Sequence, residues 1–368
     1  TEAGAFFTVI ANSNLKWETQ VSTDVALEFG LFDRLTGTIE WFRKDSKDLL
    51  FDVSQPASVG VSSIIQNIGK VSNSGVELEL DYTAFKNRDW TVSVGLNATF
   101  VKNKIKKLPA SMQEHGYING SKKWEEGRSI YDFWLRQWYG VDPQTGNGLY
   151  VPDLSKYNQG NIGKGEDNIT QAQYDAYKKT VVNVDGKELT NSYSYAKYDY
   201  SGSSIPDVFG GFNIKARYKS FDLAAVFSYQ LGGKLLDSNY STMMAMGEFG
   251  YAQSPDLLNA WKKPGDITDV PRVDNNATHS TNIGQGYSTR WLTSSNYLNL
   301  RSITLGYQLP KSLLNKVMIK SARLNLTMEN LFMLKARQGL NPMANYTGLT
   351  YNEYMPSRNT TIGLNVSF

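Results

Sequence analysis

Polar and apolar side chains alternate without interruption through the last eight residues of the chain. Ile362, Leu364, Val366 and Phe368 share one face of the predicted strand, and polar residues and a glycine occupy the other. An edge strand of a β-sandwich would explain this alternation but not the terminal phenylalanine. Strands of outer-membrane barrels end on an aromatic residue because the ring lies in the interfacial girdle. The ending therefore favours a barrel.

The same period of two recurs in eight other segments. They cover residues 75–84, 90–100, 212–218, 221–231 and 322–329 and, with weaker alternation, 19–29, 35–41 and 303–309. Their second face carries charged side chains, among them Glu77, Lys215 and Arg323. A strand with an apolar face and a charged face fits lipid outside and water inside, although a sandwich can show the same pattern.

The connections between these segments separate the two interpretations. Short joints at 31–34, 86–89, 219–222 and 310–316 alternate with long ones at about 49–72, 102–206, 233–296 and 333–357. Outer-membrane barrels alternate in this way, with short periplasmic turns and long extracellular loops. We therefore predict an all-β fold, a transmembrane antiparallel β-barrel segment of about 9–11 strands. The upper number applies only if residues 128–196, with the aromatic stretch Tyr131–Tyr139, add two strands.

The long loops have local structure of their own. Ser254–Trp261 and Gln171–Lys179 are predicted short helices, and Asp185-Gly186 predicts a hairpin. The many loop aromatics either pack internally, which is the commoner case, or contact a sugar ring or a lid protein. The candidates for such contacts are Trp124, Trp138, Tyr240, Tyr251 and Trp261.

Composition excludes several function classes. The 368 residues contain no cysteine, two distant histidines (His115 and His279) and a net charge of +3, so neither a disulfide framework, a histidine-rich metal site nor nucleic-acid binding is expected. No apolar run reaches the roughly 18–20 residues of a membrane-spanning helix. The chain opens without methionine or signal peptide, which predicts a fragment of a longer protein.

No catalytic constellation is evident. Glu77, Glu79 and Asp81 lie about 6.6 Å apart along one strand face, which suggests a glycosidase pair, but lumen-facing charge is the commoner explanation. The segment Asp142–Gly148 lacks the alternating ligands and terminal glutamate of a calcium loop, so we interpret it as a turn. We expect no enzyme activity, no cofactor and no metal, and this segment does not support calcium in the loops.

Several motifs follow one another in order along the chain. They are Asn14-Leu15-Lys16-Trp17-Glu18, Gly69-Lys70-Val71-Ser72-Asn73-Ser74-Gly75-Val76-Glu77, Ile205-Pro206-Asp207-Val208-Phe209-Gly210-Gly211-Phe212, Asn296-Tyr297-Leu298-Asn299-Leu300-Arg301, Glu329-Asn330-Leu331-Phe332 and the Phe368 ending. Together they resemble the carboxyl-terminal half of SusC/RagA-type TonB-dependent transporters. The likeness spans nearly the whole chain. It departs at Asp142–Gly148, where many relatives have a richer acidic loop.

The resemblance implies an active importer in the Gram-negative outer membrane. Its 22-stranded barrel would contain an amino-terminal plug, contact TonB, carry a SusD-like lipoprotein lid and allow a dimer of transporter–lid pairs. The cargo would be a bulky nutrient, more commonly an oligosaccharide and sometimes a peptide. Residues 1–368 would form the carboxyl-terminal part of a single barrel domain, with plug and TonB box outside this chain, long loops extracellular and the carboxyl terminus periplasmic. The alternatives are a surface glycan-binding β protein without transport and a passive structural barrel.

Overall fold

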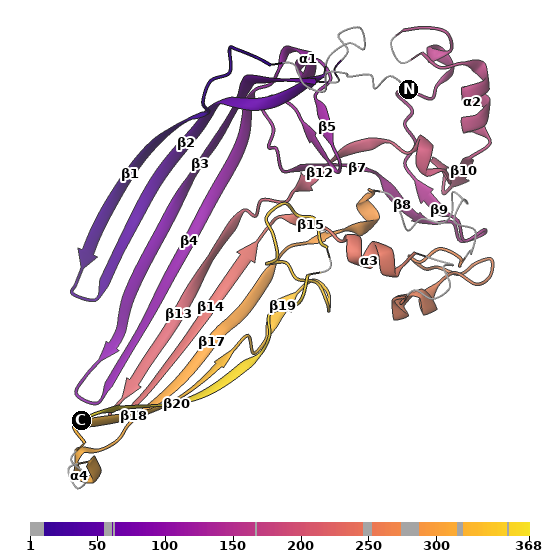
Figure 1. Ribbon diagram of the computed structural model, residues 1–368. Helices are drawn as coiled ribbons and strands as arrows, with labels where there is room; N and C mark the ends of the chain where they lie inside the picture. The colour runs from indigo at the N-terminus through magenta and orange to yellow at the C-terminus, as the bar shows by residue number, and fades with distance from the viewer. Residues whose placement is uncertain are drawn as a thin grey trace, which may run out of the picture.

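A computed structural model describes residues 11–54, 61, 63–165, 168–245, 252–273, 287–314, 319–351 and 353–368. Within these residues one antiparallel sheet of ten strands dominates (Figure 1). Its order is β1-β2-β3-β4-β13-β14-β17-β18-β20, with the short β19 also paired to β17. The strands are β1 (Thr19–Leu31), β2 (Leu35–Ser54), β3 (Ser63–Lys86), β4 (Trp90–Lys107), β13 (Val208–Tyr218), β14 (Phe221–Leu231), β17 (Tyr297–Gln308), β18 (Ser321–Glu329), β19 (Met333–Lys335) and β20 (Asn359–Ser367).

The nine long strands of this sheet coincide with the nine alternating segments, which confirms the predicted antiparallel β architecture. Each pairs with its neighbour along the chain, so the sheet is a meander that is not closed in this chain, with β1 and β20 at its edges. Unpaired backbone groups cannot face lipid, and both edges therefore require further strands in a membrane.

Turns and loops lie at opposite ends of the sheet (Figure 1). At one end short turns join β1 to β2, β3 to β4, β13 to β14 and, with the small helix α4 (Lys311–Leu314), β17 to β18. The β1–β2 turn has Phe32 and Asp33 at φ of 57° and 52°, left-handed values that fit a tight hairpin of the I′ kind. The long connections all lie at the other end, which confirms the predicted alternation.

The two faces of the sheet differ in chemistry. One face carries large apolar side chains that remain exposed, such as Leu27 and Ile362, which are 64% and 74% exposed. The opposite face carries Glu28, Glu79, Asn213 and other polar residues. An exposed apolar face of this extent is the lipid-facing surface expected of a barrel wall.

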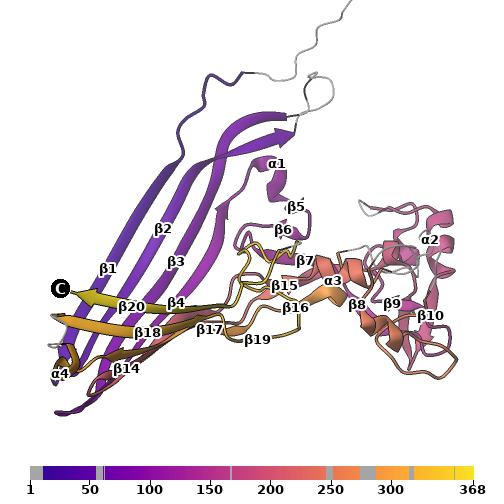
Figure 2. The same ribbon diagram turned by 60° about the horizontal axis from the view of Figure 1, so that its bottom comes forward.

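The strands β2, β3 and β4 continue well beyond their predicted ends. Residues 49–54, 63–72 and 102–107 were expected in loops but extend the sheet on the loop side (Figure 2). Alternation alone places the strand ends too early because the large apolar side chains stop at Trp41, Val76 and Phe100, and polar or charged residues follow them on the same face. Further out, two register shifts around Leu49 and one at Lys70/Val71 also interrupt the regular pairing.

The loops form small sheets and helices of their own. The strands are β5 (Tyr117–Asn119), β6 (Lys122–Trp124), β7 (Asp132–Arg136), β8 (Trp138–Val141), β9 (Gly148–Tyr150), β10 (Val181–Val184), β11 (Lys187–Thr190), β12 (Tyr198–Ser203), β15 (Lys234–Leu236) and β16 (Leu292–Ser294). The helices are α1 (Ala110–Gln113), α2 (Gln171–Lys178), α3 (Ser238–Met243) and the 3₁₀ turns η2 (Gln159–Asn161), η3 (Tyr193–Tyr195), η4 (Pro255–Asn259) and η6 (Thr289–Trp291).

These elements settle the open points about the loops. Tyr131–Tyr139 falls in β7 and β8, which pair only with other loop strands, so residues 128–196 add no strand to the main sheet. The helix at 171–178 and the hairpin at Asp185-Gly186 are confirmed, the latter as β10 and β11. The predicted helix at 254–261 is instead the 3₁₀ turn η4, capped by Ser254.

None of the helices in the described ranges is long and apolar enough to cross a bilayer.

Candidate functional site

The polar face of the sheet forms one wall of the candidate site. Glu28 on β1, Thr38 on β2 and Glu79 on β3 stand side by side in paired positions, and Asp81 pairs with Thr36 in the next row. Together with Phe29, Gly30 and Gly37 these residues line an open hollow of about 540 Å³. The three carboxylates give this part of the wall a negative charge.

Further along the same face the wall becomes neutral and then mixed in charge. Asn97 accepts a hydrogen bond from the backbone N–H of Gly211 at 2.7 Å, and Thr304 bonds Thr327 at 3.0 Å. Arg323 on β18 forms an ion pair with Asp222 on β14 across β17. A polar wall of this kind suits a water-filled lumen through which a polar solute passes.

A cavity of about 480 Å³ lies among the loops, between the β14–β17 and β18–β20 connections. Its lining combines amides, charges and one aromatic ring that is almost fully exposed, Tyr354 at 95%. The polar lining residues include Asn239, Arg337, Gln338, Asn341 and Glu353. Amide and carboxylate groups next to a free aromatic face can bind the hydroxyl groups and apolar face of a sugar, or a peptide.

Arg337 fixes one side of this cavity. Its guanidinium forms an ion pair with Asp237, a buried carboxylate that also accepts hydrogen bonds from Thr350 at 3.1 Å and from the backbone N–H of Tyr240 at 3.0 Å. Burial lowers the pKa of Arg337 to about 10, so it remains charged at neutral pH. The contact joins the two long connections because Asp237 precedes α3 and Arg337 follows β19.

Trp124 belongs to a loop core. It packs against the cluster of Val71, Ile105, Leu108 and Met112, and its indole N–H donates to the Ile130 carbonyl at 3.1 Å. In this position Trp124 contributes to the packing of the loop core.

Trp261 covers the Asp142–Gly148 turn. Its indole N–H donates to the Pro143 carbonyl at 2.9 Å, and its ring lies against Gly146. Within the turn, the buried Asp142 carboxylate accepts from the Gln144 backbone N–H at 2.9 Å and from the Thr145 hydroxyl at 2.5 Å. Both oxygens of Asp142 are therefore already bonded within the turn.

Trp138 and Tyr240 also have partners within the loops. Trp138 packs edge-on against Tyr150, with Arg290 over its ring at 4.9 Å. The Tyr240 hydroxyl donates to Asp256 at 2.6 Å, and its pKa is raised chiefly by burial and also by this carboxylate. Tyr251 lies outside the described residues. The four described candidates all pack within the loops, and the role of the five residues in binding stays a prediction.

The predicted closing strand is β20. Ile362, Leu364 and Phe368 are exposed on the apolar side, and Val366, half-buried, shares that side by register. On its paired side β20 bonds β18 over its whole length, and its other edge has no partner among the described strands.

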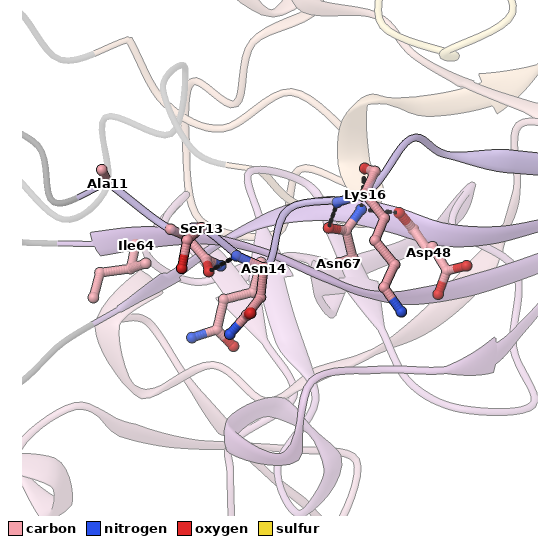
Figure 3. A pocket seen from close by; sticks show the side chains of 9 residues that line it. Ala11, Ser13, Asn14, Lys16, Asp48, Ile64 and Asn67 are labelled. Atoms are coloured by element: carbon pink, nitrogen blue, oxygen red, sulfur yellow. Dashed lines mark hydrogen bonds between the residues drawn. The ribbon is translucent and has the colours of Figure 1, made fainter.

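A second loop-side hollow, of about 570 Å³, lies where residues 11–16 cross β2 and β3 (Figure 3). The Asn67 side chain donates to the carbonyls of Lys16 and Asp48, both at 2.8 Å, and accepts from the Lys16 backbone N–H at 2.7 Å. These bonds attach the segment to the sheet, so Asn67 holds backbone and is not free for a ligand.

Sequence reasoning did not identify Asp237, Asn239 or Arg337 as site residues. No local signal could have found them, because about a hundred residues separate Asp237 from Arg337 and each alone is an ordinary polar loop residue. Tyr354 stood out only as one of many loop aromatics.

Comparison with known proteins agrees with this architecture. The family model described as "TonB dependent receptor-like, beta-barrel" matches residues 2–125. TonB-dependent receptor P3 of Formosa agariphila is 32% identical over 99% of this chain, and TonB-dependent receptor SusC of Bacteroides thetaiotaomicron is 25% identical over 97%. The structure titled "Structure of the RagAB peptide transporter" superposes with a TM-score of 0.78 at 27% identity, covering 99% of this chain and 37% of that one.

The open sheet with an exposed apolar face agrees with these matches: the chain is homologous to the β-barrel of TonB-dependent receptors, a family of outer-membrane proteins. Its matches to SusC and to the RagAB structure bear out the resemblance to the SusC/RagA type. These relatives are receptors and transporters, which agrees with the expectation of no enzyme activity. The chain spans 36% of the length of receptor P3 and 32% of that of SusC.

Proposed function

We propose that this chain forms the carboxyl-terminal part of the barrel and loop chamber of an active importer that takes up a bulky nutrient across the outer membrane. The observation that carries the proposal is the division of one sheet into an exposed apolar face and a polar face, with ordered loops at one end only. The apolar face would contact lipid, the polar face would line the lumen, and the loop end would be extracellular.

The loop cavity favours an oligosaccharide as cargo. Tyr354 offers an exposed ring. Asn239, Asn341 and Glu353 lie around it, and although each also bonds a backbone group of the loop, their polar atoms line the cavity. A peptide is the second candidate, because the RagAB structure is titled a peptide transporter. Arg337 and Asp237, two of the charged lining residues, form an ion pair with each other. The third, Glu353, has no basic partner among the described residues.

A SusD-like lipoprotein lid is the partner that the family resemblance implies. The loop end presents exposed side chains that a lid could cover, among them Leu258, Ile267 and Tyr346. TonB would act through the plug, the remaining strands would close the wall between β20 and β1, and two transporter–lid pairs could associate as a dimer.

The test uses the complete receptor that contains this chain. Uptake of labelled oligosaccharides and of labelled peptides is measured in cells with and without the receptor, and again after the proton gradient is dissipated with an uncoupler. Energy-dependent uptake of the oligosaccharide supports the proposal. Uptake that survives the uncoupler indicates a passive barrel, and binding without uptake indicates a surface glycan-binding protein.

Two substitutions locate the binding site. Tyr354→Ala and Asn341→Ala should weaken binding of the transported solute to the purified receptor by roughly five-fold to a hundred-fold, the loss of a ring contact or hydrogen bond. Tyr117→Ala is the matched control, since Tyr117 is also exposed but lies outside the cavity. Equal affinity in all variants would remove the cavity from the proposal and leave the barrel assignment intact.

A further inference from the structure

The apolar face of β1–β4 ends abruptly on the loop side. Val25, Trp41, Val76 and Phe100 are exposed and stand in one row of directly paired positions. On β4 the exposed ring of Trp90 lies ten positions before Phe100 on the same face. At a rise of about 3.4 Å per residue and a tilt of about 40°, these rings are about 25 Å apart across the membrane, the height of a lipid-facing band. The row of Phe100 therefore marks the upper edge of that band.

The rows immediately above this edge, on the same face, are rich in positive charge. They hold Arg43, Ser74 and Lys102, then Asp45, Ser72 and Lys104, then Lys47, Lys70 and Lys107. Six cations thus accompany a single carboxylate in the described strands. Asp45 is already shared, lying 3.2 Å from Arg43 and 3.8 Å from Lys70.

The row of Lys47, Lys70 and Lys107 is unfavourable as it stands. Lys70 is directly paired with Lys47 on one side and with Lys107 on the other, and like charges opposite each other destabilise a sheet. Lys47, Lys102, Lys104 and Lys107 form no ion pair with any described residue. Such an arrangement is relieved by an anion bound from outside the chain.

The opposite face at the same height is different. Val71 and Ile105 are buried there in the loop core with Leu108 and Met112. The cations are therefore gathered on the outward face, which continues the lipid-facing band without a break, while the loops pack on the other side.

We propose that Arg43, Lys47, Lys70, Lys102, Lys104 and Lys107 bind phosphate groups of the lipids that surround the barrel in the extracellular leaflet. Long basic side chains directly beyond an apolar band reach anionic headgroups while their stems lie along the hydrocarbon edge. This inference rests on the proposed function for the orientation of the barrel. Lipid is favoured over a protein partner because the patch is continuous with the lipid-contacting surface.

The test measures lipid retained by the complete, detergent-purified receptor. Native mass spectrometry counts adducts after delipidation and addition of bisphosphorylated lipid A, the same lipid without its phosphates, or inorganic phosphate. The intact receptor should retain the phosphorylated lipid and retain the other two weakly. The combined variant Lys47→Gln, Lys70→Gln and Lys107→Gln should retain roughly a tenth of it or less.

Two matched variants complete the design. Lys47→Arg, Lys70→Arg and Lys107→Arg keep the charge and should retain the lipid. Lys164→Gln, Lys262→Gln and Lys263→Gln remove three exposed loop lysines outside the patch and should change nothing. Equal retention of lipid A with and without phosphates, or unchanged retention in the glutamine variant, would overturn the inference. The inference would also be overturned if the glutamine variant lost a co-purifying protein while its lipid retention stayed unchanged.

Barrel assembly is followed in parallel by heat-dependent gel mobility. Failure of the unaltered receptor to assemble as a membrane barrel would contradict the proposed function, whereas normal assembly with phosphate-independent lipid binding would contradict only this inference. If the glutamine variant does not assemble, the comparison of the two forms of lipid A on the unaltered receptor decides.

Discussion

The guanidinium of Arg337 lies over the ring of Tyr240, 3.4 Å from its centroid. The same guanidinium forms an ion pair with the Asp237 carboxylate, which accepts a hydrogen bond from the backbone N–H of Tyr240 and so caps helix α3. One side chain thus stabilises a helix start, an aromatic ring and the junction of two loops that are distant in the sequence.

Replacement of Arg337 by methionine should therefore destabilise the loop chamber. Asp237 would remain buried without its cation, and breaking a buried pair costs about 3–5 kcal/mol; Arg337 is a quarter exposed, so we expect about 2–3 kcal/mol. Limited proteolysis of the complete receptor should show faster cleavage near residues 237–245 and 337–350.

Two other variants test the cause of that effect. Arg337→Lys keeps the charge but loses the planar stacking on Tyr240, so its cleavage rate should lie between those of the unaltered receptor and of Arg337→Met. Arg128→Met removes a cation that likewise lies over a tyrosine ring, 3.4 Å from the Tyr200 centroid, but whose partners Glu125 and Asp132 are partly exposed carboxylates. Its effect should stay below about 1 kcal/mol if the buried carboxylate is the cause. A cleavage rate unchanged in Arg337→Met would contradict the assigned role.

The facing of β20 gives a second prediction. Leu364 pairs with Leu324 on the apolar face, so Leu364→Arg places a charge in lipid at a cost of roughly 2–4 kcal/mol near the midplane. The amount of complete receptor at the cell surface and the fraction that shows heat-dependent gel mobility should both fall. Val366→Arg should act in the same direction.

Thr361→Arg is the control for this facing, because Thr361 pairs with Thr327 on the polar face of the same strand. Its assembly should be nearly normal. Equal damage from both substitutions would mean that the two faces of β20 do not differ in environment.

The sheet was predictable from the sequence, but the loop chamber was not. Alternation such as Trp90 to Phe100 is local, because each side chain's face follows from its position in a strand of period two. Its limit appeared beyond Trp41, Val76 and Phe100, where polar and charged side chains replace the apolar ones and the extended strands were mistaken for loops. The contact of Arg337 with Asp237 depends on how two long connections fold together, and neither residue's neighbours in sequence carry that information.

Trp261 and Gly146 give a third prediction. Gly146 has φ of 70°, and a Cβ there would lie 2.4 Å from the Trp261 ring. Gly146→Ala should cost about 1–2 kcal/mol of backbone strain plus the cost of displacing the ring. In a protein that also carries Trp261→Ala, Gly146→Ala should cost only the backbone strain, because there is no ring to displace. A double-mutant cycle on loop unfolding, followed by proteolysis, separates the two; strictly additive effects would show that the ring and the turn do not press on each other.

The Asp142 turn should be independent of calcium. Its carboxylate is bonded to Gln144 and Thr145, and no group of three or more metal-ligating side chains that could hold a metal occurs in the described part of the chain. The midpoint temperature of thermal unfolding of the receptor should therefore be the same with added calcium and with a chelator. A shift of several degrees on chelation would place a metal site in the loops after all.

Lys122 gives the last prediction, a dependence of loop stability on pH. Only 9% of Lys122 is exposed; its ammonium donates to the Tyr131 carbonyl at 2.7 Å and lies 3.2 Å from the Phe133 ring centroid. Burial lowers its pKa from 10.5 to about 7, and the nearby Asp132 only partly opposes this. Between these values the unfolded chain holds a proton that the folded loop has released, so the free energy of unfolding rises with pH.

From pH 7 to pH 9 this rise should be on the order of 2 kcal/mol, and below pH 7 the Lys122 contribution should level off because both states are then protonated. Hydrogen exchange of β6 and β7, corrected for the intrinsic rate at each pH, measures it. Lys122→Met fills similar space without a titrating group and should abolish the slope, whereas Lys123→Met, next to Lys122 but paired with Glu125, should keep it. The same slope in Lys122→Met would assign the pH dependence to another group.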